Sequence, residues 1–101
     1  MDVVNKLKTS RKNSIKSAQD GEILAVSAFG FLAGEQEYFA KFVEISGIDY
    51  GDIPEMVNSP SFLASVLAFL LSDDSMLLAF CQSANCIPED AVRAQHYLSE
   101  E

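Results

Sequence analysis

The sequence predicts an all-α fold, a compact six-helix domain built from two similar three-helix units and preceded by a basic N-terminal arm. Apolar residues recur at spacings of three and four, and no stretch alternates convincingly at period two. Proline and glycine are sparse, with three and five residues, and they fall mostly between the apolar runs. At 101 residues, 49% hydrophobic and 22% charged, the chain suits one domain with one modest core.

Charge divides the chain into two parts, although its overall net charge is -8. Residues 1–19 carry five basic residues against one aspartate, a net of +4, and residues 20–101 carry two basic residues against fourteen acids, a net of -12. We therefore predict a flexible arm over residues 1–16 and a single helical domain over residues 17–101. The basic residues of the arm, which are candidates for electrostatic contacts, are Lys6, Lys8, Arg11, Lys12 and Lys16.

The first three helices are expected over Ser17–Ala33, Glu35–Ser46 and Asp52–Val57. Ser17 and Asp20 have the spacing of a capping box at the start of the first helix. The second helix places its apolar residues on one face. These are Tyr38, Phe39, Phe42 and Ile45.

The last three helices are expected over Pro60–Leu71, Asp73–Ala84 and Pro88–Ser99. Ser59 can cap the fourth helix, and Pro60 suits its first position. Ser72 is the expected cap of the fifth helix, where Asp73 and Asp74 would face the positive end of the helix dipole. We interpret these two carboxylates as a helix start, without a catalytic role.

The two-unit prediction comes from an offset of 38 residues that superposes similar residues. The pairs include Phe31 with Phe69, Phe42 with Phe80, and Gly47 with Asn85. Glycine and asparagine best tolerate a left-handed helix-ending conformation, so Gly47 and Asn85 should both have positive φ. The small residues Gly30 and Ala68 also coincide, which predicts that the first and fourth helices cross there at close range.

No residue pattern indicates catalysis, a metal or a cofactor, and we predict that the protein is not an enzyme. Cys81 and Cys86 are spaced as C-x4-C, which is typical of neither redox motifs nor zinc pairs, so we interpret them as core thiols. His96 is the only histidine, and triad chemistry would depend on it. Phosphate-binding glycine motifs are absent from the sequence.

Location and nucleic-acid binding follow from the same composition. The longest uncharged apolar runs, Ile23 to Ala33 and Phe62 to Leu71, are shorter than the roughly 20 residues that a bilayer requires, so no membrane span is expected. Two cysteines without a signal peptide favour a cytoplasmic protein. The acidic globule is not expected to bind nucleic acid, because its carboxylates would repel phosphate.

We therefore hypothesise a non-catalytic protein-interaction module with an unknown protein partner or with itself in a homo-oligomer. A small core should leave some apolar side chains accessible as a partner patch. The candidates are Tyr38, Phe39, Met56, Phe62, Met76 and Tyr97. The alternative is nucleic-acid or anionic-surface binding through the basic arm.

The pattern "FLA…FxxxSGI…SPxFLxxVLxFLLxDDxxLLxFC…PEDxxxA", from Phe31 to Ala94, resembles a known family. This is a group of small bacterial, mostly alphaproteobacterial, proteins catalogued as domain of unknown function 3572. The resemblance covers roughly residues 17–98 and implies a shared helical fold, with no assigned activity. Family members more often have a polar capping residue at position 87, where this chain has Ile87.

Overall fold

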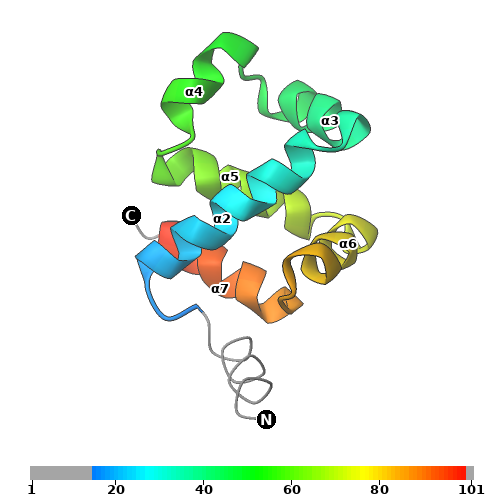
Figure 1. Ribbon diagram of the computed structural model, residues 1–101. Coiled ribbons are helices and arrows are strands. Elements are labelled where there is room, and N and C mark those ends of the chain that lie inside the picture. Colours follow the sequence, from blue (N-terminus) through cyan, green and yellow to red (C-terminus); the bar gives the residue numbers. More distant parts are fainter. Residues whose placement is uncertain (1–14, 100–101) are drawn as a thin grey trace.

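The computed structural model describes residues 15–99, which form six α-helices and one short 3-10 helix (Figure 1). No strand occurs in this part of the chain, so the all-α prediction is confirmed. The arm residues Lys6, Lys8, Arg11 and Lys12 lie outside the described residues. The elements are α2 (Ala18–Ala33), α3 (Gln36–Ser46), η1 (Tyr50–Asp52), α4 (Ile53–Met56), α5 (Pro60–Leu71), α6 (Asp74–Ala84) and α7 (Pro88–Ser99).

Local side-chain caps begin the helices α2 and α5 as the sequence predicted. The Ser17 Oγ accepts a hydrogen bond of 3.2 Å from the Asp20 backbone N–H, and the Ser59 Oγ accepts one of 3.4 Å from Phe62 N–H. The Asp20 carboxylate reaches back to the N–H of Lys16, at 3.0 Å. Each bond satisfies a backbone donor that has no partner inside its helix.

The cap of α6 is Asp73, so the prediction that Ser72 caps this helix is wrong. The Asp73 Oδ1 accepts a hydrogen bond of 3.1 Å from Met76 N–H. Asp73 is extended, with φ -137° and ψ 109°, whereas Ser72 is still helical, with φ -78° and ψ -9°. Only the extended residue can aim its side chain at the first turn of α6. Ser72 instead donates its Oγ–H to the Phe69 carbonyl, at 2.6 Å, and ends α5.

Left-handed residues end α3 and α6, as predicted. Gly47 has φ 74° and Asn85 has φ 62°, and Asn85 is the only non-glycine residue with positive φ among residues 15–99. In this conformation the backbone turns back and its N–H groups reach the last free carbonyls of the helix. The Gly47 N–H donates to Val43 O at 2.9 Å.

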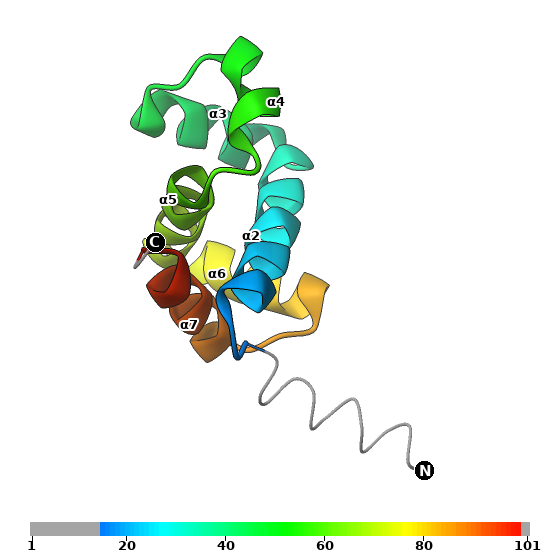
Figure 2. The ribbon, with the colours of Figure 1, turned by 90° about the vertical axis from the view of Figure 1, so that its left-hand side faces the viewer.

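The centre of the fold consists of α2, α5 and α7, each of which packs against the other two. Figure 1 shows α2 crossing in front of α5, with α7 beside both, and Figure 2 shows the same three helices from the side. Each contributes fully or almost fully buried side chains to one core. They are Ala25, Ala28 and Leu32 from α2, Leu63, Val66, Leu67 and Leu70 from α5, and Ala91, Ala94 and Leu98 from α7.

The predicted crossing of helices at Gly30 and Ala68 is wrong. Both residues are exposed, and a Cβ added to Gly30 would meet no atom within 4 Å. The face of α2 opposite to Gly30 is the buried one. The close approach occurs instead at Gly21, where an added Cβ would lie 3.2 Å from the carbonyl oxygen of Ala94 and 3.3 Å from its Cα. The tight contact of α2 is therefore with α7.

The two-unit architecture is not confirmed. The pairs α2–α3 and α5–α6 do correspond, since each second helix packs on the first. The third helices differ: α4 is a single turn that mainly contacts η1, whereas α7 has 12 residues and packs against both α2 and α5. The 38-residue offset therefore matches two helix pairs, which pack directly through α2 and α5, and α7 has no counterpart in the first unit.

A matched pair of glycine substitutions within α2 tests the close approach. Gly21→Ala should lower the free energy of unfolding by about 1–3 kcal/mol, because the new Cβ must push the Ala94 backbone away. Gly30→Ala should raise it by up to about 1 kcal/mol, because alanine favours the helix and has room there. Chemical denaturation of both variants measures the difference, and equal effects would contradict the α2–α7 contact.

A second glycine pair tests the end of α3. Gly47→Ala should destabilise the protein by about 1 kcal/mol or slightly more, because a Cβ is disfavoured at φ 74° even though no atom lies near it. Gly51→Ala is the control, since Gly51 also has open space around it but lacks a left-handed φ. A neutral Gly47→Ala in the same denaturation experiment would show that the left-handed ending is dispensable.

Candidate functional site

Two of the six predicted patch residues belong to the core. Phe62 is 3% exposed and Met76 is 2% exposed, so the expectation that they are accessible is wrong. The Phe62 ring packs edge-on against Phe29 and Phe42, with centroids 5.5 and 5.8 Å apart. Neighbouring helices cover both side chains. The apolar composition of α5 and α6 does not by itself indicate which of their residues are covered.

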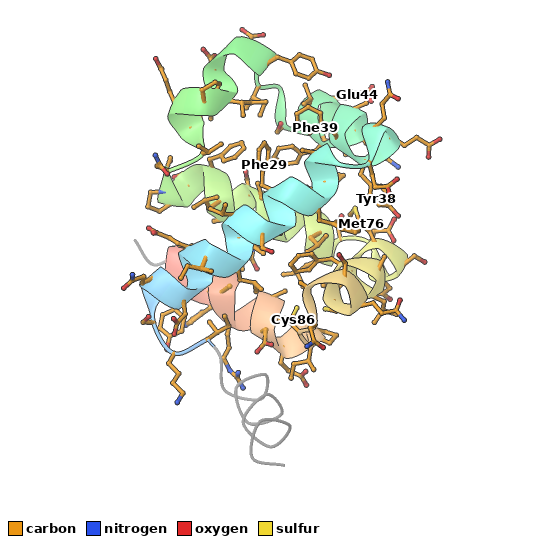
Figure 3. All side chains as sticks on the ribbon, in the orientation of Figure 1. Phe29, Tyr38, Phe39, Glu44, Met76 and Cys86 are labelled. Atoms are coloured by element: carbon orange, nitrogen blue, oxygen red, sulfur yellow. The ribbon has the colours of Figure 1, made fainter. Side chains whose placement is uncertain are left out.

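The other four candidates are half-buried and do not form one surface. Tyr38 lines a groove of about 270 Å³ between α3 and α6, where it lies close to Met76 (Figure 3). Phe39 instead packs against Phe29, with ring centroids 6.0 Å apart. Met56 lies on α4, and Tyr97 lies on α7. Only Tyr38 and Met76 are therefore brought together at one groove.

Tyr97 holds the beginning of the described chain. Its hydroxyl donates a hydrogen bond of 3.1 Å to the Lys16 backbone carbonyl, and the neighbouring Ile15 is buried. The Lys16 side chain remains exposed. The packed part of the chain therefore includes Ile15 and Lys16, which the sequence analysis had assigned to the arm.

The outer face of α2 carries exposed apolar side chains that were not among the predicted patch residues. Ile23 is 63% exposed and Val26 is 49% exposed. We define the α2 outer face as Gln19, Ile23, Val26, Ser27, Gly30 and Ala33, all exposed and none charged. In Figure 1, none of the helices of residues 15–99 lies in front of α2. The uncharged apolar run from Ile23 to Ala33 is the sequence signal for this face.

A shallow groove adjoins this face. It has a volume of about 260 Å³, and its lining is mainly apolar. The groove contains Ile23 and Ser27 of the α2 outer face, so the two features are continuous. Its residues are Ile15, Asp20, Ile23, Leu24, Ser27 and Ala84.

The two cysteines meet at the end of α6. Cys81 is buried and Cys86 is half-buried, and both are free thiols. Burial raises the pKa of Cys86 to about 12 and also raises the pKa of Cys81, where a hydrogen bond from Cys86 partly offsets it. Both thiols are therefore protonated near neutral pH and react slowly as nucleophiles.

A buried carboxylate begins α7. Asp90 is 0% exposed, and its Oδ2 accepts a hydrogen bond of 3.2 Å from Ile87 N–H. Its Oδ1 lies 3.7 Å from Nη1 of Arg93 and has no hydrogen-bond partner. Asp90 thus makes one half of a capping box, in which a side chain of the first turn accepts from the N–H of the cap residue, here Ile87.

Residues 15–99 contain no group of three or more histidine, cysteine, aspartate or glutamate side chains arranged to hold a metal ion. Within the same residues, no single helix is long and apolar enough to cross a membrane. One pair of helices, Tyr50–Met56 with Pro60–Leu71, passes that test on length and composition only, and it is bent by 114°.

These features define a small all-α domain with a buried helix-capping carboxylate, a pair of protonated thiols and an uncovered apolar helix face. Residues 18–101 match the family described as "Protein of unknown function (DUF3572)". The chain therefore belongs to this family, which confirms the resemblance noted in the sequence. Neither the curated proteins nor the solved structures gave a significant match.

The role of Asp90 can be tested by removing its carboxylate. Asp90→Ala should lower the free energy of unfolding by about 2 kcal/mol, because the N–H of the half-buried Ile87 loses its acceptor and α7 loses its capping-box bond. Asp90→Asn retains an acceptor oxygen and should recover most of this loss. The exposed neighbour Glu89 provides the control, since Glu89→Ala should change stability little. A stable Asp90→Ala protein in thermal melts would rule out the capping role.

Proposed function

We propose that this domain is a non-catalytic protein-interaction module and that it binds its partner through the α2 outer face. The observation that carries the proposal is the exposure of Ile23 and Val26 on a helix that is central to the fold. Exposed apolar side chains are ordinary when scattered singly, but a continuous uncharged face beside an apolar groove is typical of a partner surface.

The face also has the rigidity that a docking surface requires. The opposite side of α2 packs against α5 and α7, and its Ala25 and Ala28 are fully buried. A partner would therefore meet a helix whose backbone is already fixed, and little ordering entropy would be lost on binding. The small residues Ser27 and Gly30 allow the backbone of a partner helix to approach closely.

Charge indicates the chemistry of the partner. Residues 20–101 have a net charge of -12, yet the α2 outer face carries no charge. A partner that suits both features offers apolar side chains, such as those of an amphipathic helix, with basic residues around them. Salt should weaken such a complex, because it screens the attraction between the basic residues and the acidic globule.

Self-association is the alternative use of the same face. Two copies would bring two acidic globules together, so their repulsion would oppose the contact and salt would strengthen it. The opposite salt dependence therefore distinguishes a second copy from a basic partner. The basic arm offers the other candidate function, nucleic-acid or anionic-surface binding, which rests on the net charge of +4 over residues 1–19.

Binding can be tested with two matched apolar-to-acidic substitutions. Val26→Asp should weaken capture of the partner from native extract by about tenfold or more, because it places a charge on the α2 outer face. Leu78→Asp is the control, since Leu78 is similarly exposed, at 59%, but lies on α6. Thermal melts should give both variants the midpoint of the parent to within about 2 °C.

The same capture experiment separates the alternatives. Equal binding by the parent and Val26→Asp would refute the α2 outer face as the docking surface. Loss of binding on changing Lys6 and Lys8 to glutamine, with Val26→Asp unaffected, would favour the arm. Light scattering of the purified parent at low and high salt would reveal a dimer if the partner is a second copy.

A further inference from the structure

The end of α6 brings its two cysteines together through the backbone. The Cys86 N–H donates a hydrogen bond of 3.0 Å to the Cys81 carbonyl oxygen, and the Asn85 N–H donates to the same oxygen. Asn85, with φ 62°, turns the chain back toward the helix. In this kind of helix ending, the side chains of the two hydrogen-bonded residues pack against each other. Here both side chains are thiols, one buried and one half-buried.

The backbone hydrogen bond also limits the distance between the two α-carbons. With standard bond lengths, a 3.0 Å bond from N–H to carbonyl oxygen keeps them less than about 7 Å apart. A disulfide requires a separation below about 7 Å and side chains that point toward each other. The helix ending defined by this backbone bond typically packs these two side chains against each other, which suits the second requirement. The linkage can therefore form without unwinding α6.

We propose that Cys81 and Cys86 are a redox modification site, at which a low-molecular-weight disulfide such as oxidised glutathione converts the two thiols into an intrachain disulfide. Cys86 is the more exposed thiol, so it reacts first. Its thiolate attacks one glutathione sulfur, forms a mixed disulfide and releases one glutathione thiol. The Cys81 thiolate then attacks the Cys86 sulfur and releases the second glutathione thiol.

The atoms and electrons balance over the two steps. Two cysteine thiols are oxidised to one disulfide, and one oxidised glutathione is reduced to two glutathione thiols, which take up the two protons. The raised pKa values of the two thiols limit the rate at which the site is oxidised. Few thiolates are present at neutral pH, so oxidation is slow.

The site is distinct from the proposed docking function, although the two lie close together. Figure 3 shows Cys86 at the turn between α6 and α7. Ala84, which lies between the two cysteines in sequence, lines the groove beside the α2 outer face. The disulfide would fix the turn that carries Ala84 and leads into the Asp90 cap of α7.

The test uses the full chain, folded, in excess oxidised glutathione. Intact mass should reveal loss of two hydrogen atoms per chain, with no added glutathione, and dithiothreitol should reverse the change. The rate should be faster at pH 9 than at pH 7, because the raised pKa values make thiolate scarce at neutral pH. Cys86→Ser is the control variant, and it should give no intrachain product.

Other results of the same experiment would contradict the proposal of an intrachain disulfide. The chain unfolded in denaturant serves as the reference for thiol reactivity. If its thiols are oxidised while the folded chain keeps both thiols free, the site does not exist in the native structure. A folded product with only mixed glutathione disulfides, or only disulfides between chains, would also overturn the proposal.

Discussion

The close contact between α2 and α7 is the constraint on which the rest of the fold depends. It is possible only because Gly21 has no side chain where the Ala94 backbone approaches. Once α7 lies this near to α2, it also reaches α5, and the three helices enclose a core whose inner positions include small residues. Ala25, Ala28 and Ala91 are fully buried there, so any larger side chain would push the helices apart.

Side-chain size increases toward the other end of the same core. The C-terminal half of α2 contributes Phe29 and Phe31, which pack against Phe62 and Phe80 with ring centroids 5.5 and 5.6 Å apart. The chain has seven phenylalanines, and every one of them has such a ring contact. The helices lie close together at one end of the core, and aromatic rings fill the wider space at the other end. The wider end leaves room for α3 and α6 beside it.

The features that the sequence predicted correctly depend on neighbouring residues alone. Helix boundaries, the Ser17 and Ser59 caps and the left-handed Gly47 are decided within a few residues, so spacing and residue type were sufficient. One error was local, the choice of Ser72 in place of its neighbour Asp73 as the cap of α6. The others concern contacts between distant segments. Gly30 and the buried Phe62 were both misjudged, because the residues that cover a helix face come from elsewhere in the chain. The α2 outer face was missed for the same reason: an apolar helix does not itself indicate which of its sides is left uncovered.

One side of α2 is exposed because the other helices of the core pack only against its opposite side. The helix is nearly free of charge along its second half because its inner residues must pack, yet α5 and α7 cover only one side of it. Basic or acidic residues at positions 23 and 26 would have cost little stability, since surface substitutions usually change it by less than about 0.5 kcal/mol. Folding therefore does not explain why Ile23 and Val26 occupy positions where charged residues would serve equally well. The proposed binding to an apolar partner would explain it, and the apolar groove that continues from this face toward Ile15 and Ala84 would then belong to the same surface.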